Sequence, residues 1–165
     1  LDLAAICRNS LPGITASLPE TTTFHTALPH PGPTVTANAN HLEQILKNLI
    51  TNASEAIGDK EGSIRLTVRT VPSGEIPTSS RFPVNWQPQD GFYAELQVQD
   101  TGCGITKEAR EKLFDPFFTT KFTGRGLGLP VVLGIVQTQG GAVTVAGEAG
   151  QGSTFRVFLP ITKPH

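Results

Sequence analysis

Two glycine-rich segments, with a phenylalanine-rich segment between them, could bind a ligand that carries phosphate. The glycine-rich segments are residues 100–105 (DTGCGI) and 124–129 (GRGLGL), and residues 114–121 read FDPFFTTK. Closely spaced glycines are needed where the backbone takes a positive φ or approaches another group with no side chain between. The pattern predicts a flexible lid that closes over an anionic ligand, and a nucleotide is the simplest ligand of this kind.

Asp100 carries the sharpest single indication. From Phe92 to Val98 the even positions are apolar, and the polar residues Glu95, Gln97 and Gln99 alternate with them. Asp100 has the parity of the apolar set, so it points to the buried face of the strand. A buried carboxylate needs hydrogen-bond donors, and the exocyclic amine of adenine supplies one. The alternative is an ordinary Asp-Thr-Gly turn.

A second candidate lies on the helix predicted over residues 40–58. Asn48 and Asn52 are four residues apart, so their amides project side by side, and Glu55 lies on the adjacent edge. Mg²⁺ prefers oxygen ligands and needs few from the protein when phosphates supply others, so an asparagine carbonyl suffices. A solvated polar face is the alternative, but asparagine is a poor helix former and two on one stripe favour a function.

The phosphate end belongs to the segment that precedes the last predicted helix. Lys121 follows two threonines, and Gly124 and Gly126 lead into a helix whose first turn offers free N–H groups and a positive dipole end. A plain helix-entry turn is the alternative. For the phenylalanines of residues 114–118, packing in a core or a lid is favoured over contact with a ligand.

These residues need a framework, and the hydrophobic pattern predicts one. Strands are expected over residues 21–28, 34–37, 64–71, 92–100, 142–148 and 153–159, the last two as a hairpin. Helices are expected over residues 1–9 (closed by Pro12-Gly13), 40–58 (capped by Asn40), 106–113 and 127–138. Residues 72–91 hold four prolines and Trp86 and are interpreted as an inserted loop. Because helices and strands mix without strict alternation, we expect an α+β two-layer sandwich with helices on one face of a mixed sheet.

Composition excludes several classes of function. The net charge is −1 and no run of Lys or Arg occurs, which argues against a nucleic-acid surface. No apolar stretch approaches the ~20 residues that span a bilayer, and the first residues carry no signal-peptide pattern, so we expect no direct membrane contact. Cys7 and Cys103 lack metal-ligand spacing and are interpreted as reduced thiols of a cytoplasmic domain. A start at Leu1 indicates a fragment of a longer protein, which other segments could anchor to a membrane.

Taken in order, these segments resemble the catalytic, ATP-binding domain of sensor histidine kinases, in the GHKL ATPase superfamily that also holds gyrase B, MutL and a heat-shock chaperone. Residues 41–53 (HLEQILKNLITNA) resemble the N box, 100–105 and 124–129 the two glycine boxes, and 114–121 the F box. Residues 150–155 (GQGSTF), ahead of a strand that ends in Leu159-Pro160, complete the set. The resemblance covers about residues 15–160, and five ordered segments are far more specific than any one of them.

The resemblance implies a Bergerat-type fold with ATP between the helices and the lid. It implies that Asn52 binds Mg²⁺, that Asn48 is its phosphate-side neighbour, and that Asp100 binds the adenine amine with Thr154 beside it. The residues that it assigns to nucleotide binding are Asn48, Asn52, Glu55, Asp100, Gly102, Gly104, Ile105, Phe118, Lys121, Gly124, Arg125, Gly126, Leu127, Gly128, Leu129 and Thr154. Among them Asn48 and Lys121 are the expected catalytic residues. We expect residues 1–12 to be the tail of a preceding helical linker and residues 13–165 to form the catalytic domain.

Two residues depart from the family pattern. Arg125 stands where a small residue or Thr is common, and it either adds a phosphate contact or faces solvent. Pro130 stands where Ala or Ser is frequent. Proline is tolerated only in the first turn of a helix, so this helix should begin near Leu127.

Position 48 separates the activities found within the superfamily. Members that hydrolyse ATP with their own general base carry Glu there, whereas Asn48 cannot accept a proton in that way. The resemblance therefore implies a domain that binds ATP and Mg²⁺ and donates the γ-phosphate to a histidine on a separate dimerisation domain of the same protein. A response regulator of a two-component system would be the further partner. None of the four histidines (His25, His30, His41 and His165) stands in a phosphoacceptor context. The alternative is a catalytically silent nucleotide-binding module that signals through lid order.

Overall fold

The computed structural model describes residues 1–78, 81–83, 85–104, 128–147 and 150–161, and the structural statements below concern these residues. The helices are α1 (Leu3–Thr15), α2 (Ala39–Ile57) and α4 (Gly128–Thr138), with a short 3-10 helix, η1 (Ser73–Glu75). The strands are β1 (Thr22–Ala27), β2 (Gly62–Pro72), β3 (Arg81–Phe82), β4 (Phe92–Asp100), β5 (Ala142–Gly147) and β6 (Ser153–Pro160). The helix predicted over residues 106–113 lies outside the described residues.

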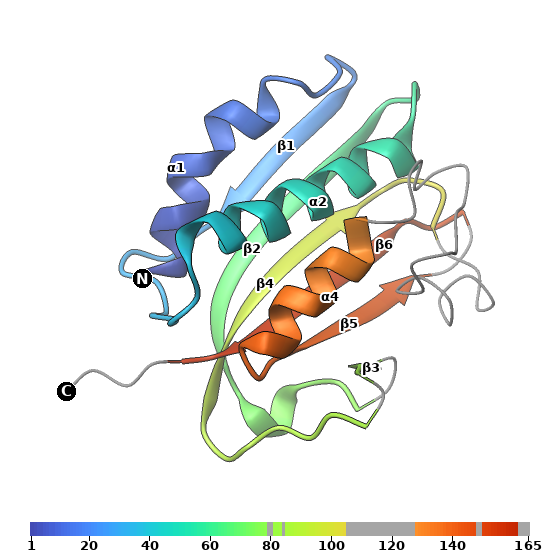
Figure 1. Cartoon of the computed structure of the whole chain (residues 1–165). Coiled ribbons are helices and arrows are strands. Elements are labelled where there is room, and N and C mark those ends of the chain that lie inside the picture. The colour runs from blue at the N-terminus through green and yellow to red at the C-terminus, as the bar shows by residue number, and fades with distance from the viewer. Residues whose placement is uncertain (79–80, 84, 105–127, 148–149, 162–165) are drawn as a thin grey trace.

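The strands form one mixed sheet in the order β1-β2-β4-β6-β5-β3. β1 and β2 are parallel because α2 connects them, and the other neighbouring pairs are antiparallel. Figure 1 shows α1, α2 and α4 lying along one face of this sheet. The predicted α+β two-layer sandwich is thus confirmed.

The central helix α2 forms because a cap and a continuous apolar stripe coincide. The Asn38 side chain caps it by accepting a hydrogen bond from Asn40 N at 2.7 Å. The predicted cap at Asn40 is wrong by two residues, since Asn40 is already helical. The apolar stripe is buried throughout and consists of Leu42, Ile45, Leu46, Leu49, Ile50, Ala53 and Ile57. Burying each large member of this stripe contributes about 1.5–3 kcal/mol.

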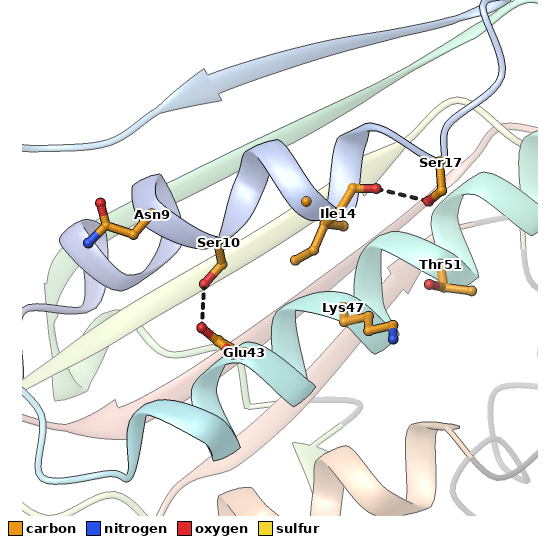
Figure 2. A pocket seen from close by; sticks show the side chains of 8 residues that line it. Asn9, Ser10, Ile14, Ser17, Glu43, Lys47 and Thr51 are labelled. Atoms are coloured by element: carbon orange, nitrogen blue, oxygen red, sulfur yellow. Dashed lines mark hydrogen bonds between the residues drawn. The ribbon is translucent and has the colours of Figure 1, made fainter.

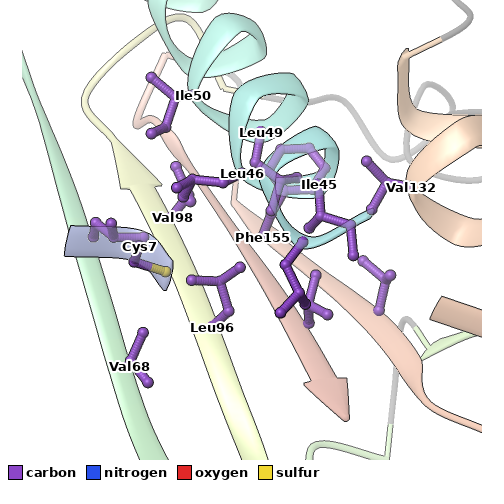
Figure 3. Packing of buried hydrophobic residues seen from close by; sticks show 14 of the residues in the cluster. Cys7, Ile45, Leu46, Leu49, Ile50, Val68, Leu96, Val98, Val132 and Phe155 are labelled. Carbon is purple, nitrogen blue, oxygen red and sulfur yellow. The ribbon is translucent and has the colours of Figure 1, made fainter. Parts of the chain in front are cut away.

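The stripe packs on the strands below it. Figure 3 shows side chains of α2, such as Leu46 and Ile45, directed toward Val98 and Leu96 of β4 and Phe155 of β6. The polar residues of α2 occupy the rest of its surface, and Asn48 and Asn52 lie beside the apolar stripe, both half-buried.

Strand β4 confirms that Asp100 points to the same face as the apolar residues of the strand, but the first of these apolar residues is exposed. Ala94, Leu96 and Val98 are buried with Asp100, whereas Phe92, the first of the apolar set, is 62% exposed. Glu95 was placed by alternation on the polar side, and it does lie on the face away from the helices, but it is only 1% exposed. Arginines from the neighbouring strands β2 and β6 cover it, which alternation within β4 alone does not reveal.

The N-terminal segment differs from the sequence expectation. α1 continues through Pro12 to Thr15 instead of closing at Pro12-Gly13. Pro12 lies in the last turn, so its missing N–H removes a single intrahelical bond. Residues 34–37 form no strand, and only an isolated bridge joins Asp2 and Thr34. Leu3, Ala4 and Cys7 are buried in the main core, while the domain division after residue 12 stays a prediction.

The insertion over residues 72–91 is not only loop. It contains η1 and β3, and β3 pairs with β5 at the edge of the sheet. Arg81 donates hydrogen bonds to the carbonyls of Ile76, Pro77 and Trp86. The Trp86 ring meets Tyr93 edge-on, in a second, smaller core with Val71, Ile76 and Phe158.

The last helix and the terminal hairpin follow the sequence prediction closely. α4 begins at Gly128, so Pro130 lies in its first turn as expected. Leu129, Val132 and Val136 are buried, whereas the equally apolar Val131 is 39% exposed. β5 and β6 pair as the predicted antiparallel hairpin.

Candidate functional site

Asp100 ends β4 on the helix-covered side of the sheet and is only 4% exposed. Its Oδ1 accepts a hydrogen bond from Gly102 N at 2.8 Å, and its Oδ2 accepts one from Ser153 Oγ at 2.7 Å. Each carboxylate oxygen has two lone pairs, so both oxygens can accept one further hydrogen bond. The carboxylate is therefore oriented by the protein while it keeps the capacity to receive a donor.

The electrostatics of Asp100 favour such a donor. Burial raises the pKa of this carboxyl above its ordinary value, and the hydrogen bonds from Ser153 and Gly102 only partly offset that effect. An additional N–H donor would stabilise the ionised form in the same way that the existing donors do. An exocyclic amine is a donor of this kind.

Gly102 lies against the C-terminal end of α2 with no room for a side chain. A Cβ added there would lie 2.5 Å from the backbone carbon of Ala56. Cys103 N also donates to Ala56 O at 3.0 Å. Ala56 is four residues after Asn52 and so lies one turn along the same helix face. The glycine segment is thereby fixed beside the asparagine stripe.

The turn between β5 and β6 closes this arrangement from the other side. Gly150 N donates to Cys103 O at 2.6 Å. Gly152 has a φ of +80°, and a Cβ there would lie 2.2 Å from Asp100 O. Gly104 takes a φ of +74°, which also favours glycine. The structure thus brings three of the five predicted motifs together: the N box, the first glycine box and the final glycine turn.

Asn52 supplies the observation that tests whether a metal-bound nucleotide fits here. Its Nδ2 is buried and has no hydrogen-bond partner in the described part of the chain. A buried amide end without a partner is costly unless another group satisfies it. The N and O of an asparagine amide exchange places by a rotation of the side chain, so either end can take this position. The side chain fits a role as an oxygen ligand. Asn48 is half-buried one turn earlier and Glu55 is exposed.

Ser153 is the site residue that sequence reasoning missed. Thr154 was expected beside Asp100, but it is the cross-strand partner of Gln99, on the face of the sheet away from the helices. Ser153 is the partner of Asp100 and is 5% exposed. The signal was present, because Ser153 has the same parity as the core residues Phe155 and Val157. The assignment of Thr154 to nucleotide binding stays a prediction.

The predicted phosphate end lies largely outside the described residues. This holds for Ile105, Phe118, Lys121, Gly124, Arg125, Gly126 and Leu127, whose assigned roles stay predictions. Gly128 begins α4, and Leu129 is 3% exposed in the core.

Another cleft of about 660 Å³ lies between α1 and α2, away from these residues. Figure 2 shows Glu43, Lys47 and Thr51 of α2 lining it opposite α1. This stripe is rotated by about 100° from that of Asn48 and Asn52. No predicted site residue lines this cleft. Within the described residues no cluster of His, Cys, Asp and Glu could hold a metal ion, and no helix is long and apolar enough to cross a membrane.

The comparison with protein families decides the identity of the fold and site. A profile of the family described as "Histidine kinase-, DNA gyrase B-, and HSP90-like ATPase" matches residues 37–163. This chain belongs to that ATPase family. The match extends over the N box, the glycine boxes and the terminal hairpin, so the family predicted from those motifs is confirmed.

Curated relatives of this ATPase domain are similar over about three quarters of its length. The chain is 38% identical over 128 residues to the sensor kinase CckA of Brucella abortus, covering 76% of the chain and 13% of the relative. It is 36% identical over 129 residues to the sensor histidine kinase ZraS of Escherichia coli (78% and 23%). It is 38% identical over 132 residues to the sensory histidine kinase/phosphatase NtrB of Rhizobium meliloti (79% and 33%). The chain spans a third or less of these relatives.

Solved structures confirm the fold. The catalytic domain of the histidine kinase ThkA, in a nucleotide-free form, superposes with a TM-score of 0.75 at 26% identity, covering 98% of this chain and 94% of that one. Full-length ShkA in complex with AMPPNP gives a TM-score of 0.75 at 29% identity, covering 99% of this chain and 31% of that one. The ATPase domain described here has the architecture of a histidine-kinase catalytic domain.

Proposed function

We propose that this domain binds Mg²⁺-ATP and donates its γ-phosphate to a histidine on a separate dimerisation domain of the same protein, from which a response regulator of a two-component system receives it. The observation that carries the proposal is the Asp100 carboxylate, buried and oriented beside the glycine segment and the asparagine stripe. The names of the similar proteins, all sensor kinases, and the AMPPNP complex of ShkA support it. Such a domain would act in the cytoplasm, where ATP is available.

At the base end, the proposal assigns Asp100 to the adenine amine. The amine would donate to a free lone pair of the carboxylate, while Gly102 and Gly104 leave room for the ring. Guanine presents a carbonyl oxygen at the corresponding position, and two acceptors facing each other in a buried site would repel. The site should therefore select ATP over GTP.

At the metal end, the proposal assigns Asn52 to Mg²⁺. The amide would turn its oxygen toward the ion, which satisfies the buried amide end, and the phosphates would provide further oxygens. The ion would neutralise phosphate charge when bound. Asn48, one helical turn earlier, would lie on the phosphate side.

The proposed reaction needs no general base from this domain. Asn48 cannot take a proton, and the imidazole that receives the phosphate is itself a nucleophile. The bond that breaks joins the γ-phosphorus to the oxygen bridging it to the β-phosphate, and the bond that forms joins phosphorus to the imidazole nitrogen, so ADP leaves. Lys121 and the backbone of residues 124–129 are the groups proposed to hold the phosphates.

Calorimetric titration with ATP, ADP and GTP, each with and without Mg²⁺, tests the binding part of this proposal. We expect ATP and ADP to bind and GTP to bind at least about 100-fold more weakly. Asn52→Ala should weaken Mg²⁺-ATP binding much more than metal-free ADP binding, whereas Thr51→Ala, on the neighbouring stripe of α2, should change neither. Equal binding of ATP and GTP would contradict the role of Asp100, and equal losses with and without Mg²⁺ would make Asn52 structural.

A further inference from the structure

The face of the sheet opposite α1, α2 and α4 carries an excess of arginine. Arg65 and Arg69 of β2 have the parity opposite to the core residues of that strand, and Arg156 of β6 does likewise. Among the described strand residues on this face, Glu95 is the only acidic one. We call Arg65, Arg69 and Arg156 the arginine face. It carries more positive than negative side chains even though the net charge of the chain is −1, and Glu75 of η1 adds a negative charge near Arg69.

Buried Glu95 forms ion pairs with two of these arginines, and Gln97 accepts the hydrogen bond of one of them. Arg69 Nε donates to Glu95 Oε2, and Arg156 Nε lies 3.1 Å from Glu95 Oε1 while donating to Gln97 Oε1 at 3.0 Å. Glu95 is 1% exposed, whereas the side chains of Arg69 and Arg156 are 58% and 28% exposed. Both guanidinium groups are thus fixed through their inner nitrogens.

The outer nitrogens of these guanidinium groups stay available. Within the described residues, no hydrogen bond or ion pair engages the Nη atoms of Arg69 or Arg156, and none engages the side chain of Arg65. A guanidinium presents its N–H groups as a planar fork that matches a carboxylate. Because the guanidinium groups of Arg69 and Arg156 are already ordered, binding a partner costs less arginine side-chain entropy than it would with mobile side chains.

The register of the strands fixes the spacing of the three residues. Arg65 and Arg69 are four residues apart on β2, which separates their Cα atoms by about 13 Å. Arg156 pairs with Gln97 of β4, which pairs with Thr67 of β2, so it lies about 10 Å to the side and midway between the two. The three residues thus form a triangle about 13 Å long and about 10 Å wide on this face of the sheet.

We propose that the arginine face docks an acidic surface of a protein partner, whose Asp and Glu side chains pair with the outer guanidinium nitrogens. Charge complementarity carries the choice of partner, since this face presents three arginines, and the one acidic strand residue on it, Glu95, is buried and pairs with only two of them. The three guanidinium groups are held apart on the sheet, so each can pair with a different carboxylate of the partner. The arginine face lies on the opposite side of the sheet from Asp100, so docking there leaves the nucleotide site open.

A fluorescein-labelled poly-glutamate peptide is the probe that tests this proposal, with binding followed by fluorescence anisotropy at about 50 mM and about 300 mM salt. Arg65→Glu reverses one charge at a side chain that makes no hydrogen bond or ion pair within the described residues, and it should weaken binding about tenfold. The double variant Arg69→Gln/Glu95→Gln keeps the net charge and leaves no buried carboxylate unpaired. It removes the guanidinium group of Arg69, so it should also weaken binding severalfold. Arg8→Glu, the same charge reversal on α1, is the matched control and should bind the peptide far more tightly than Arg65→Glu does.

Each outcome decides the proposal. It stands if both arginine-face variants lose peptide binding, the α1 control keeps it and the higher salt concentration reduces it. It fails if the unaltered chain does not bind the peptide, if either arginine-face variant binds as tightly as the unaltered chain, or if duplex DNA or phosphatidylserine vesicles bind more tightly than the peptide. ATP titration of the same variants should be unchanged, so failure here is separate from failure of the nucleotide site.

Discussion

At the scale of single residues, Asp100 shows how a buried carboxylate is prepared for a ligand. Gly102 N and Ser153 Oγ already donate to it, so its position does not depend on a bound base. Truncation to alanine would therefore leave two donors unpaired, at about 1–3 kcal/mol each. Removing a carboxylate that met donors only from the base would cost little stability. Asp100 differs, because donors from the protein already bind it.

Asp100→Asn is consequently the sharper variant. It keeps the shape of the side chain and an oxygen for Gly102 N, but the ionised acceptor is lost. We expect ATP and ADP affinity to fall by about 1.5–3 kcal/mol, the contribution of a hydrogen bond to a charged group, while the fold persists. Calorimetry with thermal unfolding of the same sample checks both parts, and unchanged affinity in a folded variant would contradict the assignment.

The raised pKa of Asp100 gives this variant a pH signature. Because burial raises the folded-state pKa above the unfolded value of 3.8, folding favours the protonated carboxyl. The unaltered chain therefore loses stability as the pH rises from the unfolded pKa through the folded pKa. The stability of Asp100→Asn relative to the unaltered chain should increase over that window and then level off. Urea unfolding at a series of pH values measures this difference, and a decrease with rising pH would show that the pKa is lowered instead.

Ser153 and Thr154 provide a matched pair of adjacent residues. Ser153→Ala removes a donor from the buried carboxylate, so nucleotide affinity and stability should both fall, the stability by about 1–3 kcal/mol. Thr154→Ala, on the other face of the sheet, should change nucleotide affinity little. If the two variants ranked in the opposite order, Thr154 would be the residue that supports the site, as the family resemblance implies.

At the scale of elements, the long periodic segments were predictable and the tertiary contacts were not. α2 was predictable because its apolar residues recur with the helical period of 3.6 residues, and β4 because its apolar residues alternate with a period of 2. The burial of Glu95 depends on arginines from β2 and β6, and β3 forms by pairing with the edge strand β5. Both features depend on residues far apart in the chain, so a local sequence pattern does not reveal them. For the site, parity predicted Asp100, whereas its partner Ser153 required the register between β4 and β6.

The contact between the first glycine segment and α2 makes a prediction at this scale. In Gly102→Ala the added Cβ would meet the backbone of Ala56, so the segment must shift away from the helix that carries Asn52. We expect nucleotide affinity to fall at least about tenfold, with some loss of stability. Gly74→Ala, where nothing lies within 4 Å of the added Cβ, is the control and should bind nucleotide normally. Normal binding by Gly102→Ala would show that this contact does not position the site.

The start of α2 gives a second test. Asn38→Ala removes the cap and should lower the free energy of unfolding by about 1 kcal/mol. Asn40→Ala should cost much less, because Asn40 is inside the first turn and alanine is a better helix former. Equilibrium denaturation of both variants measures the difference, and a larger loss for Asn40→Ala would restore the cap that the sequence pattern favoured.

At the scale of the whole molecule, one sheet separates two surfaces. The helix-covered side carries Asp100 and the asparagine stripe, and the opposite side carries the arginine face. The insertion over residues 72–91 lies at one edge of the sheet, where β3 pairs with β5 and Trp86 Nε1 donates to Gly140 O, just after α4, at 3.1 Å. Because the two surfaces lie on opposite faces of the sheet, we expect substitutions in the arginine face to leave nucleotide binding unchanged.

Phosphate transfer tests the central claim most directly. The domain is incubated with γ-labelled ATP and Mg²⁺, alone and with the histidine-bearing dimerisation domain of its own full-length protein. We predict no label on this chain and negligible ATP hydrolysis when it is alone, because Asn48 is no base, and labelled histidine when the second domain is present. Appreciable turnover by the chain alone would move it toward the gyrase-like ATPases, and ATP binding without transfer to the histidine would make it a silent nucleotide-binding module.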